Sequence, residues 1–221
     1  MKILGVDLTA NYSSMAVKID DDINSISISH STRARPGWDK LLNNLIPKEI
    51  ILDDLDAVAY ANGPGSFTSL RSAAAFVKAI AASKKIPLIP VSSLKAMAWE
   101  SKKWVKQVPY IIHVCNVAEK ENLYYAAYNL DTNKIDVVTE PTLVTKDFIK
   151  QIFNNEDYLI GDAWEDESFA ARLVTDYVSF SADAVVSIAS GYIIQKKSFS
   201  NNDIEPIYLT NPKYRKIKKD G

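Results

Sequence analysis

The first half of the chain changes repeatedly between hydrophobic patterns typical of strands and patterns typical of helices. Short apolar or alternating runs bounded by polar turns predict strands, whereas apolar positions three and four apart predict helices. In order, the predicted elements are strands at residues 2–8, 14–19 and 23–30, a helix at 38–47, a strand at 56–61, a helix at 67–83 and a strand at 86–91. The order is β-β-β-α-β-α-β.

The second half repeats this order of elements without repeating the sequence. Its predicted elements are strands at residues 110–116, 123–130 and 134–144, a helix at 146–153, a strand at 158–160, a helix at 168–173 and a strand at 177–180. Each half then ends in a further helix, at residues 93–104 and 184–199. We therefore predict two lobes, residues 1–104 and 105–221, which meet in the lysine-rich segment 101–107.

A glycine loop joins a predicted strand to the long helix that follows it. Gly63 and Gly65 allow positive φ angles, and Pro64 restricts the turn between them. Either Ser66 or Thr68 is suited to cap the start of the helix. The amides at this helix start suit an anion, but a tight connection whose glycines serve packing is the commoner use of such a loop in α/β proteins.

Composition is that of an ordinary globular protein, and we expect a cytoplasmic one. The chain has 221 residues, 47% of them hydrophobic, and no apolar run reaches the roughly 18 residues that span a bilayer. One cysteine excludes an internal disulfide, and with only His30 and His113 it leaves too few ligands for a structural zinc site. The formal charge of -1 argues against free-standing affinity for a polyanion. The basic segment at residues 213–219 is compatible with RNA phosphates, though a solvated terminus is the simpler interpretation.

No residues of the sequence match a common catalytic motif. His113 and Cys115 lie two apart on one face of a predicted strand, a spacing that permits a thiolate–imidazole pair. The commoner interpretation is a buried histidine with satisfied hydrogen bonds beside a packed thiol. No serine occupies a Gly-x-Ser-x-Gly turn, so a hydrolase of that type has no nucleophile. The acidic run at residues 165–167 is typical of a solvated helix start.

The glycine loop belongs to a longer motif, Gly-Pro-Gly-Ser-Phe-Thr-x-Leu-Arg, whose positions include Gly63, Pro64, Gly65, Ser66, Phe67, Thr68 and Arg71. With the alanine-rich helix after it, the runs at residues 3–9 and 86–94, and later segments at 123–128 and 206–209, this motif resembles the bacterial TsaB (YeaZ) family. The resemblance implies an α/β duplicated actin-like, sugar-kinase-like (ASKHA, RNase H-like) two-lobe fold. It also implies a non-catalytic subunit that takes part in forming threonylcarbamoyladenosine at adenosine 37 of tRNA.

The resemblance further implies the partners. Family members pair through the two helices of the first lobe with a catalytic TsaD-type subunit, and a small TsaE-type ATPase joins the pair. We therefore expect no cofactor or metal on this chain, ATP, Mg²⁺ and metal on the partner subunits, indirect contact with tRNA through the complex, and no membrane partner. Small side chains on the long helix and an apolar stripe on the shorter one suit this interface. Its predicted members are Trp38, Leu41, Leu45, Ser69, Ser72, Ala73 and Phe76.

A free-standing enzyme of the same fold is the competing hypothesis. Such enzymes hold ATP with glycine-containing turns after the first strand of each half. Asp7 follows the first strand, where an acidic residue would orient a metal or water, but residues 8–12 contain no glycine. Residues 115–119 contain neither aspartate nor glycine, so Asp7 is predicted to mark a vestigial cleft. Three functions stay open: a scaffold subunit, an ATP-dependent phosphotransferase or hydrolase, and a homodimeric interaction module.

Overall fold

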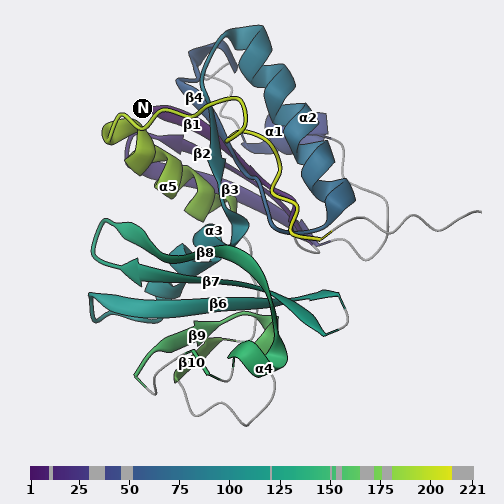
Figure 1. Ribbon diagram of the computed structural model, residues 1–221. Helices are drawn as coiled ribbons and strands as arrows, with labels where there is room; N and C mark the ends of the chain where they lie inside the picture. Colours follow the sequence, from purple (N-terminus) through teal and green to yellow (C-terminus); the bar gives the residue numbers. More distant parts are fainter. Residues whose placement is uncertain are drawn as a thin grey trace, which may run out of the picture.

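The computed structural model describes residues 1–9, 12–29, 38–45, 52–119, 121–149, 151–152, 156–164, 172–175 and 181–210. These residues form two lobes, each built around a five-stranded sheet (Figure 1). The first half contains β1 (Lys2–Asp7), β2 (Tyr12–Ile19), β3 (Asp22–Ser29), α1 (Trp38–Leu45), η1 (Leu52–Asp54), β4 (Ala57–Ala61), α2 (Phe67–Lys84), β5 (Leu88–Val91), α3 (Ser93–Glu100) and η2 (Ser101–Lys103). The second half contains β6 (Tyr110–Glu119), β7 (Asn122–Leu130), β8 (Ile135–Thr145), α4 (Lys146–Ile149), β9 (Tyr158–Ile160), η3 (Asp162–Trp164), β10 (Arg172–Thr175) and α5 (Ala182–Ile194).

The two sheets have the same topology. The first has the order β3-β2-β1-β4-β5, and the second, read from its other edge, has the order β8-β7-β6-β9-β10. In each half the first three strands pair as antiparallel neighbours, and the last two join in parallel beside the first strand. This shared order confirms the predicted α/β fold of two related lobes, the duplicated actin-like architecture.

The helix that ends each half packs against the sheet of the other half. α5 contacts β1 and β2, and Val186 lies so close to Gly5 that a side chain at Gly5 would have no room. α3 contacts β6 and β7 and lies between the two sheets (Figure 1). One cluster of buried apolar side chains therefore joins both lobes through these two helices. The predicted division after residue 104 separates the two sheets, but each lobe is completed by a helix from the other half.

The region after β9 differs from the sequence prediction. Arg172–Thr175 forms β10, which pairs in parallel with β9, so the helix predicted at residues 168–173 is wrong at its last two positions. The run Leu-Val-Thr favours a strand because branched side chains pack well on a sheet. The strand predicted at 177–180 lies outside the described residues. The helix predicted at 146–153 is the single turn of α4. The other predicted elements are confirmed, apart from their ends.

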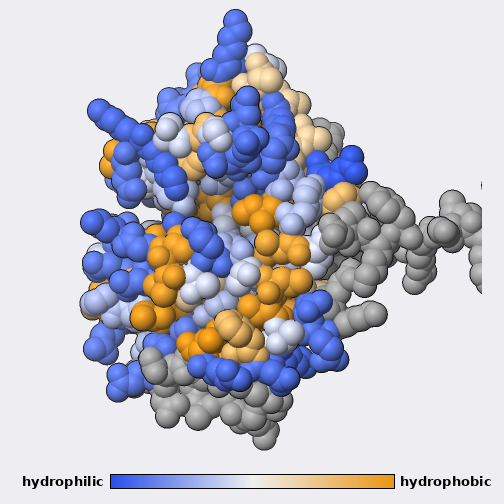
Figure 2. All heavy atoms as spheres, in the orientation of Figure 1, coloured by the Kyte–Doolittle hydropathy of each residue, from blue (hydrophilic) through white to orange (hydrophobic). Residues whose placement is uncertain are grey.

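Polar side chains cover much of the molecular surface seen in Figure 2, with apolar side chains gathered over the second lobe. Exposed apolar residues of that lobe are Ile111, Val117, Val137, Val138 and Phe148. Within the described residues, no helix combines the length and hydropathy needed to cross a membrane.

Candidate functional site

The two glycines of the motif are required by close contacts with other segments. Gly63 has a φ angle of +110°, and a Cβ atom there would lie 2.7 Å from the backbone oxygen of Ile207. Gly65 has no positive φ angle, so the prediction of a left-handed conformation is wrong at this position. A Cβ atom at Gly65 would instead lie 3.0 Å from both the Cβ and the backbone oxygen of Thr9, at the exit of β1. The loop is thus packed against the chain itself.

The carbonyl groups of the loop hold the start of α3. The Ser93 N–H donates to the Gly63 oxygen at 2.9 Å, and the Ser93 hydroxyl donates to the Pro64 oxygen at 2.5 Å. Ser66 is the N-cap residue of α2, but its side chain makes no capping hydrogen bond. Thr68 lies within the helix. These contacts support the packing interpretation of the glycine loop.

A segment far along the chain, residues 199–210, covers the end of β4 and the glycine loop; we call it the C-terminal strap. Its Ile207 N–H donates to the Asn62 oxygen at 2.7 Å, and the Asn62 side chain donates to two strap carbonyls, at 3.3 Å and 3.2 Å. The Tyr60 hydroxyl donates to the Ile204 oxygen at 2.6 Å. Sequence reasoning missed the role of Asn62, although the resemblance had included Ile207 in a later family segment.

The strap also brings an aromatic side chain beside the motif. Tyr208 is 42% exposed, and its ring centroid lies 4.8 Å from that of Phe67. The guanidinium of Arg71 lies over the Phe67 ring, 5.4 Å from its centroid. Two motif residues and one strap residue thus form a solvent-facing cluster at the start of α2, which we call the aromatic–arginine patch.

Asp7 lies at the exit of β1 and is buried, with 1% of its surface exposed. Its Oδ1 accepts hydrogen bonds from the Thr9 N–H at 2.8 Å and the Thr9 hydroxyl at 2.6 Å, while Oδ2 is buried without a hydrogen-bond partner. Burial raises the pKa of Asp7, and the two bonds from Thr9 partly oppose this rise. No group of three or more His, Cys, Asp or Glu side chains among the described residues has an arrangement that could hold a metal ion.

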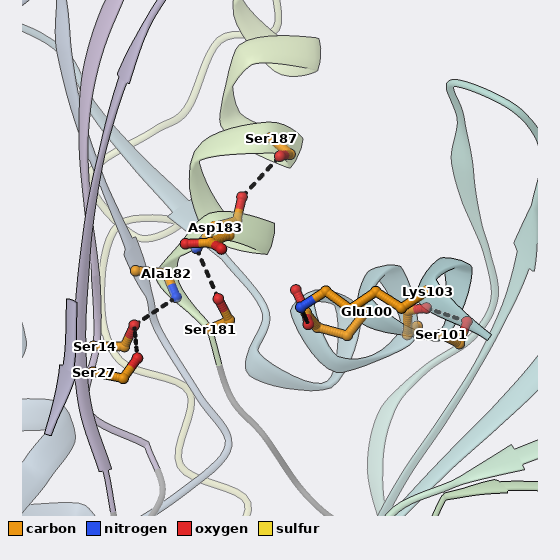
Figure 3. Close-up of polar contacts among 10 residues, drawn as sticks. Ser14, Ser27, Glu100, Ser101, Lys103, Ser181, Ala182, Asp183 and Ser187 are labelled. Carbon is orange, nitrogen blue, oxygen red and sulfur yellow. Dashed lines mark hydrogen bonds and ion pairs between the residues drawn. The ribbon is translucent and has the colours of Figure 1, made fainter. Parts of the chain in front are cut away.

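Two further acidic side chains lie near the lobe junction (Figure 3). Glu100, at the end of α3, is 3% exposed and forms an ion pair with Lys103. Burial raises the pKa of Glu100, as do the negative charges of Asp183 and Asp7. Asp183, in the first turn of α5, has one buried carboxylate oxygen without a partner, and its N–H donates to the Ser181 hydroxyl at 3.2 Å. The Glu100 carboxylate is thus held by burial and by its ion pair with Lys103.

Asp7→Asn is expected to stabilise the protein at neutral pH. Because the native pKa is raised, the native state binds the proton more tightly than the unfolded chain, and wild-type stability is lost as the pH rises from about 3.8 through the native pKa. Asparagine keeps an oxygen for Thr9 without the buried charge. Urea unfolding should show a stability gain that grows with pH above about 4. The exposed control Asp21→Asn should show no comparable growth, and a gain that is the same at all pH values would contradict the assignment.

Some of the residues predicted to form the partner interface are instead buried in the core of the first lobe. Leu41 and Leu45 of α1 are 2% and 6% exposed, and Ala73 of α2 is 1% exposed, all within the core of the first lobe. The prediction that these three side chains contact a partner is therefore wrong, because the apolar stripe of α1 covers its own sheet. The side chain of Trp38 lies outside the described residues. Partly exposed members of the predicted set are Ser69, Ser72 and Phe76.

The histidine and cysteine of β6 do not form an activated thiolate pair. His113 is hydrogen-bonded through Nδ1 to the Tyr125 hydroxyl at 2.7 Å and through Nε2 to Asp157 at 3.1 Å. Cys115 is fully buried in an apolar cluster, and burial raises the pKa of its thiol. The interpretation of a satisfied histidine beside a packed thiol is confirmed. His30, the acidic run at 165–167 and the basic segment at 213–219 lie outside the described residues.

The chain matches, over residues 24–217, the family described as TsaD: tRNA N6-adenosine threonylcarbamoyltransferase. It is 27% identical over 195 residues to the tRNA threonylcarbamoyladenosine biosynthesis protein TsaB of Haemophilus influenzae. The aligned residues cover 83% of this chain and 80% of that protein. The protein of the same name from Buchnera aphidicola subsp. Acyrthosiphon pisum is 30% identical over 159 residues, 69% of each chain. YeaZ from Pseudomonas aeruginosa shares the fold, with a TM-score of 0.79 at 19% identity, over 94% of this chain and 99% of that chain. The chain therefore belongs to the TsaD family, and within it to the TsaB (YeaZ) proteins of tRNA threonylcarbamoyladenosine biosynthesis.

Proposed function

We propose that this chain is a non-catalytic scaffold subunit of the complex that transfers the threonylcarbamoyl group to adenosine 37 of tRNA, and that it pairs with a catalytic TsaD-type subunit. The observation that carries this proposal is the packing of Thr9, just after β1. Thr9 lies against Gly65 and donates two hydrogen bonds to Asp7, whose carboxylate is buried. An acidic side chain held in this way is not open to a metal or to attacking water, so the partner subunit supplies metal, ATP and substrate.

The outer face of α2 is the proposed docking surface for the TsaD-type subunit. Its exposed side chains are mostly small, namely Thr68, Ala75, Ala79 and Ala82, with Ser72 partly exposed at the edge. Small side chains let a second helix approach closely, and a partner that matches the same family description brings helices of the same kind. The TsaE-type ATPase then joins this pair. The competing proposal is that isolated chains form a homodimer through the same face of α2.

Ser72→Arg is expected to weaken capture of the TsaD-type subunit while leaving the isolated chain folded. An arginine side chain on a close-packed helix face must displace the partner, and such overpacking costs about 1–3 kcal/mol, or roughly a 5- to 150-fold loss of affinity. Copurification with a tagged copy of this chain and titration by calorimetry measure the effect. Light scattering on the same samples separates heterodimer from homodimer.

Ser25→Arg is the matched control, because Ser25 is an exposed serine of β3, on a different element of the same lobe. It should capture the partner as well as wild type does. If Ser72→Arg binds the TsaD-type subunit with wild-type affinity, the docking surface lies elsewhere. Reconstituted tRNA modification should fall in parallel with capture.

A further inference from the structure

We propose that Asp7, Glu100 and Asp183 form a proton-dependent contact at the junction of the two lobes, closed while the three carboxyl groups share a proton and loosened when that proton is lost. We call these three side chains the carboxyl cluster. They come from the end of β1, the end of α3 and the first turn of α5. The contact belongs to the isolated chain and does not depend on the proposed partner subunit.

The carboxyl cluster lies where the two halves of the chain exchange helices. α5 contacts β1, and α3 contacts both α5 and the strands β6 and β7 of the second sheet. Asp183 at the start of α5 and Glu100 at the end of α3 lie on the two sides of this junction (Figure 3). Asp7 lies on the strand that α5 covers. A change of charge in the cluster therefore acts on the contacts that join the lobes.

Two oxygen atoms of the carboxyl cluster are buried without a hydrogen-bond donor. Asp7 is 1% exposed, and its Oδ1 accepts both hydrogen bonds from Thr9. Asp7 Oδ2 and Asp183 Oδ1 have no hydrogen-bond partner in the part of the chain that the structure describes. A buried carboxylate oxygen without a donor is costly, whereas a protonated carboxyl is neutral and its O–H can donate to another carboxylate. A proton is thus the ligand that suits this closed site.

Lys103 is the cation that faces the carboxyl cluster. It lies in η2 and pairs with Glu100, but its side chain is 56% exposed, so water screens its charge. Burial raises the pKa of Glu100, Lys103 opposes this rise, and the negative charges of Asp183 and Asp7 add to it. Burial likewise raises the pKa of Asp7. The closed junction therefore binds a proton more tightly than carboxyl groups in water do.

Other elements packed on α3 and α5 carry no charge or direct it elsewhere. The strands β4, β5 and β7 have no charged residue. Lys95 of α3 is faced by Asp136 and Glu140 of β8. His113 of β6 is hydrogen-bonded to Asp157, outside the cluster. These groups leave the negative charge of the carboxyl cluster to Lys103 and to the shared proton.

Neutral hydrogen bonds hold the start of α5 on the first sheet. The Ala182 N–H donates to the Ser14 hydroxyl at 3.1 Å, and the Ser27 hydroxyl donates to Ser14 at 3.0 Å. The charges of β2 and β3, Lys18 and Asp22, lie at the other ends of those strands. Because amides and hydroxyls do not titrate near neutral pH, the pH dependence of the junction comes from the carboxyl cluster.

Rising pH favours the loosened junction, because the closed state binds the proton more tightly. The closed contact is fully stable below the ordinary carboxyl pKa of about 4 and is weakened as the pH rises through the raised native pKa values. Release of one proton changes the opening equilibrium by up to about tenfold per pH unit. Since the three groups interact, the proton belongs to the cluster and not to one residue.

The test is hydrogen exchange of the purified full chain, measured by mass spectrometry from about pH 5 to about pH 8. Protection factors, corrected for the intrinsic pH dependence of exchange, should fall by up to about tenfold per pH unit in α3 and the start of α5, and less in β6 and β7. Combined Asp7→Asn and Glu100→Gln should remove this dependence, because they neutralise the groups with raised pKa values at nearly constant volume. Asp183→Asn alone should weaken it, because it removes a charge that acts on Glu100.

Combined Asp21→Asn and Glu121→Gln is the matched control, because it makes the same two changes at exposed positions, one in each half of the chain. It should keep the wild-type pH dependence. Protection in wild type that is independent of pH would overturn the proposal. So would protection that falls equally in all elements, because that result reports global unfolding.

Infrared spectroscopy detects the proton directly. At about pH 6, where ordinary carboxyl groups are ionised, wild type should show the C=O stretch of a buried protonated carboxyl. Asp7→Asn combined with Glu100→Gln should lack this band, whereas Asp21→Asn combined with Glu121→Gln should keep it. If the first pair fails to fold, the wild-type band and the exchange profile of Asp183→Asn decide the question. Absence of the band, or a wild-type profile in Asp183→Asn, would then contradict a shared proton.

Discussion

Replacing Gly63 with valine is expected to lower the free energy of unfolding by roughly 3 kcal/mol. Its φ angle of +110° is one that a β-branched residue adopts only with strain. A Cβ atom at Gly63 would also lie 2.7 Å from the backbone oxygen of Ile207, which cannot rotate away as a side chain can. The strap must therefore move. Urea unfolding gives the loss of stability, and limited proteolysis should cut the strap faster in the variant.

Two other glycines provide the controls for this prediction. A Cβ atom at Gly191, in α5, would meet no atom outside its own helix within 4 Å, so Gly191→Ala should be neutral or stabilise the helix by up to about 1 kcal/mol. Gly65→Val tests the contact alone, because this position lacks a positive φ angle but meets Thr9 at 3.0 Å. A Gly63→Val protein with the wild-type unfolding curve and an intact strap would show that neither the φ angle nor the contact matters.

Ala73→Glu is expected to destabilise the isolated chain by at least about 3 kcal/mol. Ala73 is 1% exposed and packs in the first-lobe core with Leu41 and Val77. A glutamate there would bury a charge without a partner and would also exceed the available space. Thermal unfolding and near-ultraviolet circular dichroism measure this loss of stability in the isolated chain. The loss does not depend on any effect on a partner.

Ala75→Glu separates this loss of folding from a loss of docking. Ala75 is exposed on the same helix two residues away, so the same substitution there should change stability by no more than about 0.5 kcal/mol. On the proposed docking surface it should nevertheless weaken capture of the TsaD-type subunit. If Ala73→Glu is as stable as Ala75→Glu, then Ala73 does not face the core.

Much of the candidate site was recognisable in the sequence as a motif but not as a structure. Gly63 and Pro64 were correctly predicted to form a tight strand-to-helix connection. The tertiary contacts of that connection were not predictable, because Asn62 donates a hydrogen bond to a carbonyl 143 residues away and Gly63 lies against the strap. Periodicity reports neighbours within a few positions, and it carries no information about contacts at such separations.

The sequence by itself determined the order of strands and helices, the glycine loop and the two-lobed α/β class, because alternation, helical spacing and turn residues are local properties. Only the tertiary structure decided which sheet each closing helix covers and which side of α2 is buried. The helix is rich in alanine all round, so Ala73 in the core and Ala75 in solvent have the same side chain and give no amphipathic signal. Their difference comes from the packing of α2 on the sheet, which is a property of the whole fold.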